Sequence, residues 1–426
     1  MRLGGRVAAA IEVLDDIDRR HRPVADALKD WGLSHRFAGS GDRAAIGNIV
    51  YDALRRRRSA SWLLDGDGAR ALAFGALMLE WKLSPAEINA TIEGDRFSPS
   101  PLSAEERAAS SRPLTSAPEA VRADAPDWCV PLLEAAFGAA WIEQSAALAA
   151  RPPLDLRVNT LLSDRTKVLT ELDETGAAPT ALAPYGVRVA PVVGEGRHPN
   201  VQAEPAFQRG WVEVQDEGSQ IVALLADARP GSAVLDYCAG GGGKTLALAA
   251  AMENSGSIHA YDSEKQRLAP IFDRLRRAEA KNVEVISRAA ALEPLLGMQD
   301  LVLVDAPCTG SGTWRRRPDA KWRLAQKQLD QRKREQSAIL DAASRYVKPG
   351  GRLAYITCSA FDAENGEQIE AFLTRNAAFR QVNHVDLWNA RLPGAGDKAL
   401  LGNGIRLTPL TSGTDGFYFA MLERAA

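Results

Sequence analysis

The stretch LDYCAGGGGKT, Leu235–Thr245, places four glycines, a lysine and a threonine directly after an apolar segment. Glycines in such a turn let the backbone approach a ligand closely. The P-loop pattern needs a glycine where this chain has Cys238, and the loop also departs from GxGxxG. A second apolar run, LVLVDAPC, includes Asp305, which would suit the magnesium-binding aspartate of an NTPase. The loop by itself therefore leaves a nucleotide hydrolase open.

The sequence around this loop alternates between short apolar segments and amphipathic ones. We expect strands at residues 232–238, 257–262, 283–288, 300–308 and 352–359, and helices at 244–253, 263–280, 329–347 and 364–376. Repeated strand–helix units predict an α/β fold, with a mostly parallel sheet and helices on both faces. Ligands of such sheets bind at the carboxyl ends of the strands. Four polar residues lie at or just past these ends: Asp236, Asp262, Asp305 and Cys358.

The chain before this region shows two other patterns. Residues 1–95 carry apolar side chains at helical spacing, and residues 96–126 are rich in Ser, Pro and Ala, as in a linker. The segments LDLRVNT and VRVAPVV predict strands around a helix. We therefore expect three domains: a helical one with its linker over residues 1–125, a small α+β module over 126–226, and the α/β domain over 227–426.

Composition limits the class of protein. The 426 residues are 46% hydrophobic and 25% charged, with a net charge of −2, and no apolar run is long enough to span a membrane. The first apolar stretch contains acids, unlike that of a signal peptide. Four scattered cysteines without a CxxC pair argue against disulfides and zinc. We expect a cytoplasmic protein with no metal and no membrane partner.

Basic residues gather in short clusters despite the acidic net charge. Arg55–Arg58 form one cluster, and Arg315–Arg317 form another beside Lys321 and Arg323. Such clusters can bind a phosphate backbone, although a single one is more often a solvated helix face. Trp314 and Trp322, which lie among the second cluster, could stack on bases or pack in a core.

The acids near the glycine loop indicate which ligand it binds. Asp236 directly precedes the loop and would repel a triphosphate, whereas it would attract a cofactor that carries a sulfonium and an ammonium group. Asp262 follows at the spacing of the carboxylate that accepts ribose hydroxyls in dinucleotide-binding folds. Together these features favour S-adenosylmethionine (AdoMet) over NAD.

Two thiols, Cys308 and Cys358, come just past strand ends of the same expected sheet. One reaction uses such a set directly, the methylation of cytosine at C5. A thiolate adds to C6, which makes C5 nucleophilic enough to take the methyl group, and the thiol leaves after C5 loses its proton. An acid near N3 must meet the developing charge, and Asp305 is placed for that.

The motifs resemble the RsmB/Sun/NSUN family of AdoMet-dependent RNA (cytosine-5) methyltransferases, above all its bacterial 16S rRNA members. DAPCTGSGTWRRRPD is similar to the family's PC motif, YITCS to its TC motif, and LDYCAGGGGKT to its cofactor loop; RPPLDLRVNT, VEVQDEGSQ and TDGFYFAMLER also match. The resemblance covers nearly the whole chain. It implies a Rossmann-like class I methyltransferase domain, preceded by the α+β module and a NusB-like RNA-binding domain.

The resemblance also implies roles for individual residues. Cys358 would be the nucleophile and Cys308 would assist product release, with Asp305 and Lys244 completing the catalytic set. The expected cofactor residues are Cys238, Ala239, Gly240, Gly241, Gly242, Gly243, Lys244, Asp262, Arg267, Arg288 and Asp305. The expected RNA contacts are Arg157, Asn159, Arg315, Arg316 and Arg317. We expect a monomer that binds RNA.

This chain departs from the family pattern in three places. Gly240–Gly241 replace the usual Ala-Pro, Arg288 or Ala289 stands where an acid would meet the adenine amino group, and ENGE at 364–367 replaces ENE. Two kinds of alternative remain. One is a tRNA or DNA cytosine-5 methyltransferase, where the DNA chemistry would use Cys308 as nucleophile. The other is a non-catalytic RNA-binding ribosome assembly factor with the same fold.

Overall fold

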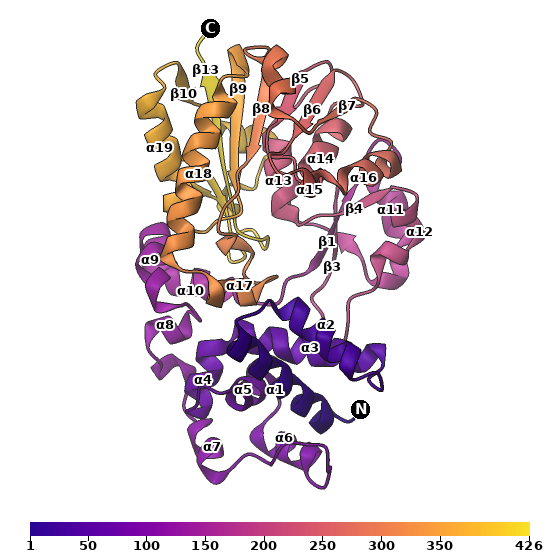
Figure 1. Ribbon diagram of the computed structural model, residues 1–426, viewed down its shortest axis with the longest axis vertical. Helices are drawn as coiled ribbons and strands as arrows, with labels where there is room; N and C mark the ends of the chain where they lie inside the picture. The colour runs from indigo at the N-terminus through magenta and orange to yellow at the C-terminus, as the bar shows by residue number, and fades with distance from the viewer. The chain divides into compact units, whose positions relative to one another are not determined.

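The computed structural model describes residues 1–426, and its internal contacts divide the chain into two units (Figure 1). We call residues 1–152, 191–198 and 314–325 the helical unit. Residues 153–190, 199–313 and 326–426 form the sheet unit. Two short segments that are remote in sequence thus belong to the helical unit, and the predicted boundaries near 125 and 226 stay a prediction.

The helical unit is built almost entirely from α-helices. They are α1 (Leu3–Arg20), α2 (Val24–Ser34), α3 (Ser40–Arg55), α4 (Arg57–Leu64), α5 (Ala69–Leu79), α6 (Pro85–Ile92), α7 (Ala104–Ala109), α8 (Glu119–Arg122), α9 (Val130–Phe137), α10 (Trp141–Ala147) and α17 (Pro318–Arg323). Its core contains Val7, Ile46, Ile49 and Phe74, which are fully buried. The predicted helical N-terminal region is confirmed, and α7 and α8 lie within the stretch predicted as a linker.

The sheet unit begins with a small antiparallel sheet. Its strand order is β2-β3-β1-β4, with β1 (Leu154–Val158), β2 (Ala178–Pro179), β3 (Gly186–Val189) and β4 (Val212–Val214). The helices α11 (Arg165–Glu171) and α12 (Pro205–Gln208) accompany these strands. The predicted α+β module is therefore present.

The larger sheet has the order β11-β12-β13-β9-β8-β5-β6-β7, and β10 pairs with β13. The strands are β5 (Ala233–Asp236), β6 (Ser257–Tyr261), β7 (Val283–Ile286), β8 (Gln299–Asp305), β9 (Val347–Thr357), β10 (Phe379–Gln381), β11 (Leu400–Leu401), β12 (Ile405–Leu407) and β13 (Phe417–Arg424). The strands β7, β6, β5, β8 and β9 are parallel, whereas β13 pairs antiparallel with β9. This confirms the α/β prediction.

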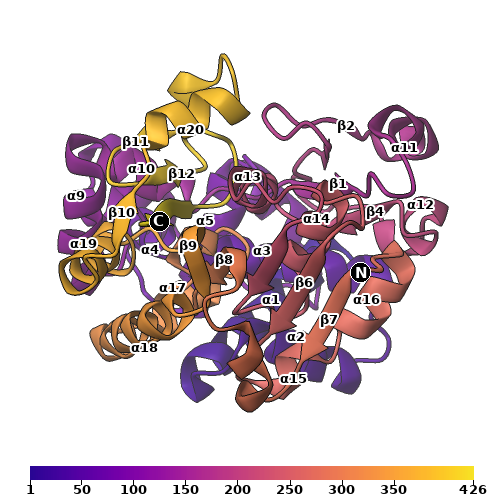
Figure 2. The ribbon, with the colours of Figure 1, turned by 90° about the horizontal axis from the view of Figure 1, so that it is seen from above.

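Alternate residues of the central strands face opposite layers of helices, as the pleat requires. Val234 and Leu303 pack with α13 (Glu217–Leu225) and α14 (Gly243–Ala251). Val302 and Tyr355 pack with α18 (Gln326–Ser344) and α19 (Gly366–Arg375). Figure 2 shows α13 and α14 on the opposite side of the sheet from α18. Because both faces are covered, the middle of β8, Leu301–Val304, is apolar without alternation.

One predicted helix is wrong in detail. The segment 263–280 forms two helices, α15 (Lys265–Leu268) and α16 (Ile271–Ala278), instead of one. Pro270 lies between them, and a proline interrupts a helix because it lacks the backbone N–H. Near the C-terminus, α20 (His384–Arg391) packs on α13. No helix combines the length and the apolar character that a bilayer crossing requires.

Candidate active site

The glycine loop connects the end of β5 to the start of α14. Gly240 and Gly242 have φ angles of 50° and 80°, in the left-handed region that favours glycine. A Cβ atom on Gly242 would lie 2.5 Å from Cγ1 of Ile271, so a side chain there would be excluded on two grounds. Together these two positions keep the loop free of side chains where α14 begins.

Asp236 lies at the end of β5 and is completely buried. Its Oδ2 accepts a hydrogen bond of 2.7 Å from the Thr245 hydroxyl, while its Oδ1 is buried without a hydrogen-bond partner. Burial raises the pKa of this carboxyl to about 7. A buried acceptor without a donor costs free energy, so this oxygen is suited to a ligand that brings a donor.

Asp262 links the glycine loop to the end of β6. Its carboxylate accepts hydrogen bonds of 3.0 Å from the backbone N–H groups of Gly240 and Glu264. The Arg267 guanidinium lies 3.2 Å from the same carboxylate, so the structure brings these predicted cofactor residues together. A carboxylate has about four acceptor positions, which leaves capacity for ribose hydroxyls.

Lys244, in the first turn of α14, forms an ion pair with Asp305 at the end of β8. The Nζ atom of Lys244 lies 2.6 Å from Oδ2 of Asp305, and the lysine is almost fully buried. The Asp305 side chain remains 35% exposed, which leaves it open to a ligand. The two residues predicted to act with the thiols are therefore in contact.

The thiols of Cys308 and Cys358 lie next to each other, with 3.4 Å between the two Sγ atoms. Cys308 lies in the loop after β8 and Cys358 in the loop after β9, and both residues are partly exposed. The hydrogen bond to Cys358 is the largest of the effects that raise the pKa of Cys308 well above its usual value. Cys308 therefore keeps its proton, and its S–H can donate a hydrogen bond to the Cys358 sulfur.

A buried carboxylate holds both cysteine loops in place. Glu364, which is fully buried, accepts hydrogen bonds from the Thr309 N–H (2.9 Å), the Thr309 hydroxyl (2.5 Å) and the Ser359 hydroxyl (2.5 Å). The Gln336 amide donates to the same carboxylate (2.9 Å) and to the Pro307 carbonyl (3.0 Å). Thr309 and Ser359 each follow a cysteine directly, so Glu364 determines the separation of the thiols.

Sequence reasoning missed Glu364. The altered ENGE segment indicates that the second acid is shifted or lost, whereas its first acid is the one that both loops use. Its neighbour Asn365 also contributes, because its amide donates to the Ser359 carbonyl and its oxygen accepts from Thr357. The ENGE segment itself was the available signal, since it follows the TC cysteine by only a few residues.

Comparison with known protein families identifies the family of this chain. The family described as 16S rRNA methyltransferase RsmB/F matches residues 223–423, and a ferredoxin-like domain of RsmF/B-like methyltransferases matches residues 125–193. The probable ribosomal RNA small subunit methyltransferase B of Synechocystis is 33% identical, over 70% of this chain and 67% of its own length. This chain belongs to the RsmB/F family.

Other relatives and solved structures agree with that assignment. The ribosomal RNA small subunit methyltransferase B of Erwinia tasmaniensis is 36% identical, over 70% of this chain and 66% of its own length. The crystal structure of PH0851 has a TM-score of 0.74 and 24% identity and covers 100% of both chains. The structure of NSun6 from Pyrococcus horikoshii with SFG has a TM-score of 0.60 and 21% identity, over 71% of this chain and 98% of the other. Both structures support the fold.

The other residues predicted to bind the cofactor in this RsmB/F member differ in burial and in hydrogen bonding. Cys238 and Ala239 are buried, and the Ala239 N–H donates to the Tyr261 carbonyl, which ties the loop to β6. Burial raises the pKa of Cys238 well above its usual value, so this cysteine is no thiolate. The Gly241 carbonyl accepts a hydrogen bond from Arg274. Arg288 is exposed just past the end of β7, and its cofactor role stays a prediction.

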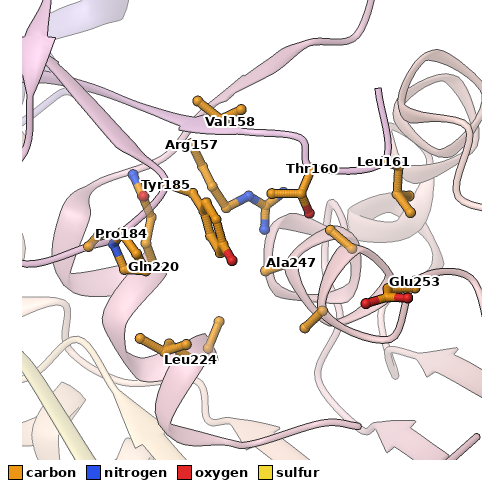
Figure 3. A pocket seen from close by; sticks show the side chains of 14 residues that line it. Arg157, Val158, Thr160, Leu161, Pro184, Tyr185, Gln220, Leu224, Ala247 and Glu253 are labelled. Atoms are coloured by element: carbon orange, nitrogen blue, oxygen red, sulfur yellow. The ribbon is translucent and has the colours of Figure 1, made fainter. Parts of the chain in front are cut away.

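Arg157, a predicted RNA contact, lines a cavity of about 470 Å³ within the sheet unit. In Figure 3 its side chain lies beside those of Thr160 and Tyr185. The guanidinium is buried, donates a hydrogen bond of 3.3 Å to the Gly243 carbonyl and has an unpartnered Nε. Burial lowers its pKa to about 10, so the charge remains at neutral pH.

The other residues predicted to contact RNA differ in how far the protein covers them. The buried Asn159 amide donates to the carbonyls of Gly210 (3.0 Å) and Ala278 (2.9 Å). In the helical unit, Arg315 is buried, Arg316 is half-buried and Arg317 is exposed. RNA binding by these residues stays a prediction, and Arg317 is the one whose side chain is open to solvent.

Proposed function

We propose that this protein transfers a methyl group from AdoMet to C5 of a cytosine in 16S rRNA. The observation that carries the proposal is the contact of 3.4 Å between the Cys308 and Cys358 thiols, at the ends of neighbouring parallel strands. The RNA substrate comes from the relatives, which are described as ribosomal RNA small subunit methyltransferases. The alignments span about two thirds of these relatives, so the substrate remains part of the proposal.

The residues present fit AdoMet. The orphaned Oδ1 of Asp236 would accept from an ammonium group, and the loop of Gly240 to Gly243 has no side chains that would keep a ligand from its backbone. Asp262 would accept the ribose hydroxyls, which supports the same cofactor. When bound, AdoMet supplies an electrophilic methyl group on a sulfonium. Arg288 gives no acceptor for the adenine amino group, so a backbone carbonyl would have to serve.

The two thiols would divide the reaction between them. The Cys358 thiolate attacks C6 of the cytosine, and the new S–C6 bond moves the electron pair of the C5–C6 double bond toward N3. The Lys244–Asp305 pair, with Nζ donating to Oδ2 over 2.6 Å, would supply a proton at N3. C5 would then take the methyl group, which leaves the cofactor as a thioether, and would lose its proton to a base. The S–C6 bond would break as the C5–C6 double bond re-forms and N3 returns its proton to the Lys244–Asp305 pair. Cys308 would stabilise the departing thiolate by donating its S–H hydrogen bond.

Covalent trapping tests this proposal directly. Wild type, Cys358→Ala and Cys308→Ala would be incubated with AdoMet and 16S rRNA transcripts, with cytidine or 5-fluorocytidine at the target positions. Fluorine cannot leave as a proton, so the nucleophile stays bonded to the RNA. We expect the adduct to disappear in Cys358→Ala, and Cys308→Ala to accumulate an adduct even on normal RNA.

Two results would contradict the assignment. Loss of the adduct in Cys308→Ala alone would reverse the roles of the thiols and favour the DNA-type chemistry. Tight AdoMet binding without an adduct on any RNA would leave a binding protein on a methyltransferase fold. A calorimetric titration with AdoMet and with ATP separates both results from a nucleotide hydrolase.

A further inference from the structure

A small cavity in the helical unit has an unusual lining. Its volume is about 130 Å³, and it is lined by Asn48, Tyr51, Arg55, Arg151, Pro152, Val192, Gly196, Arg197 and His198. Three of these residues are arginines and one is a histidine, and none is an acid. Pockets for whole cofactors or drug-sized ligands measure about 300–1,000 Å³, so this cavity suits a single chemical group.

The Arg55–Arg58 cluster contributes only its first member to the cavity. Arg56 pairs with Glu80 (2.6 Å), Arg57 with Asp18 (2.9 Å), and Arg58 with Asp127. Arg56, Arg57 and Arg58 therefore form ion pairs within the helical unit. Arg55 is different, because its guanidinium is buried and lines the cavity wall.

Two arginines of the lining share one acid. Asp52 is fully buried and pairs with Arg55 over 2.9 Å. Both of its carboxylate oxygens also accept hydrogen bonds from Arg151. Arg55 also donates from Nε to the Arg315 carbonyl (2.9 Å), which leaves Nη2 with no hydrogen bond. The buried part of the lining therefore carries an excess of positive charge.

The third arginine of the lining comes from the segment 191–198. The Asn48 amide donates to the carbonyls of Gly194 (2.8 Å) and Gly196 (2.7 Å), which fixes this segment against α3. Arg197 follows directly, is exposed and makes no hydrogen bond or ion pair. The fixed segment thus holds an uncompensated guanidinium at the cavity.

Two neutral donors complete the lining. The His198 Nδ1 atom is buried without a partner, and burial, followed by the charges of Arg316 and Arg151, lowers the pKa of this histidine. A neutral imidazole has one N–H, and the His198 ring also has a hydrogen bond to the Pro152 backbone, so it donates into the cavity only with its N–H on Nδ1. The Tyr51 hydroxyl, which also lines the cavity, donates none in the structure. Donors from several residues thus converge, and the excess of cations calls for an anion.

We propose that this cavity binds one phosphate group of the substrate RNA backbone. The inference rests on the proposed function, from which it takes the RNA. Guanidinium groups bind phosphate oxygens strongly, and the cavity is too small for a nucleoside. Phosphate contacts fix the register of a nucleic acid without reading its bases. The site would therefore position the rRNA by way of the helical unit.

The test measures RNA affinity against salt concentration. Arg197→Ala removes an exposed and unpaired charge, and Tyr51→Phe removes one donor while it keeps the ring. The control is Arg36→Ala, which removes another exposed arginine without a partner in the same unit but outside the cavity. All four proteins would be titrated with a 16S rRNA fragment between 50 and about 300 mM salt, the range over which such contacts weaken.

We expect Arg197→Ala to weaken binding about 3- to 10-fold and to reduce the slope of log K against log salt by about 0.7–0.9, the value for one phosphate contact. Tyr51→Phe should weaken binding about 2- to 5-fold with an unchanged slope, because no charge is lost. An unchanged slope in Arg197→Ala, or an equal loss in Arg36→Ala, would overturn the site.

A second measurement distinguishes RNA from free phosphate. Thermal unfolding of the wild type and of Arg197→Ala would be compared in sodium phosphate and in sodium chloride at equal ionic strength. If phosphate stabilises the wild type alone while the RNA slope of the variant stays normal, the site serves free phosphate and the assignment to RNA fails. Covalent trapping at saturating RNA should proceed normally in Arg197→Ala. If neither Arg197→Ala nor the wild type forms an adduct, the proposed function fails, and this site fails with it.

Discussion

The two halves of the active site are built from different interactions. The cofactor half of the candidate site, at the ends of β5 and β6, depends on charges: Asp236, and Asp262 with Arg267. The thiol half, at the ends of β8 and β9, uses neutral donors around a buried carboxylate, with hydroxyl and amide groups that fix the two cysteine loops. A cofactor that carries charge needs fixed counter-charges, whereas a thiol pair needs exact spacing without a field that would alter both protonation states.

The largest expected effect concerns Cys358, because the thiol half has one nucleophile. Cys358→Ser should lower methyl transfer about 10⁴-fold or more and leave AdoMet affinity within about twofold, since an alcohol is a far weaker nucleophile at neutral pH. Single-turnover transfer of labelled methyl groups measures the rate, and calorimetry measures the affinity. A parallel loss of AdoMet binding would show that the two halves are not separate.

Next in size is the effect of Glu364. Glu364→Gln should lower the rate of methyl transfer about 10- to 100-fold, because its NH2 group would replace one carboxylate oxygen and set a donor either against the N–H groups of Thr309 and Gln336 or against the two hydroxyls. The control is Glu367→Gln, an acid of the following helix α19 whose side chain is 58% exposed. The alkylation rate of the two thiols against pH, followed by mass spectrometry, should shift in Glu364→Gln alone. An unchanged pH profile would leave Glu364 a stabilising residue only.

The cofactor half should respond in affinity instead of rate. Asp262→Asn should weaken AdoMet binding about 10- to 100-fold, since hydrogen bonds to a charged acceptor contribute about 1.5–3 kcal/mol. Thiol alkylation should remain as in the wild type. Equal AdoMet affinity in the variant would remove Asp262 from the proposed ribose site. Asp273→Asn, which changes an acid of α16 with a 79% exposed side chain, is the matched control.

A further effect is a dependence of stability on pH. Burial raises the pKa of Asp236 from its usual 3.8 to about 7, so between these values the folded chain holds a proton that the unfolded chain has lost. Its contribution to stability is therefore present below about pH 4 and is lost as the pH rises to about 7, a change of at most about 4 kcal/mol. The free energy of unfolding, measured with denaturant and plotted against pH, should therefore have a different slope in the wild type and in Asp236→Asn over this pH range.

The same carboxyl should affect cofactor binding with the opposite sign. An ammonium group prefers the ionised form, so AdoMet affinity should rise as the pH passes through about 7 and level off above it. Calorimetry between pH 5.5 and 8.5 measures this, and Asp236→Asn should give a flat profile. A wild-type affinity that is independent of pH would mean that the ammonium group does not bind at Asp236.

The sequence predicted the α/β fold because strand–helix alternation and apolar runs are local properties. The same holds for the cofactor half, since Asp236, Gly240, Gly242 and Lys244 lie within ten residues and Asp262 follows at a familiar spacing. The break at Pro270 was missed although proline is itself a local signal. The division of Arg55–Arg58 into ion pairs could not be predicted, because the acids are distant in sequence.

By itself, then, the sequence predicted the parallel sheet, the side-chain-free loop and the two candidate thiols. Only the tertiary structure decided that Cys308 and Cys358, fifty residues apart, lie 3.4 Å from each other and that Glu364 holds both loops. It also decided that Arg197 joins Arg55 at one cavity. Local patterns fix elements because they depend on neighbouring residues, whereas contacts between strand ends depend on how the elements pack.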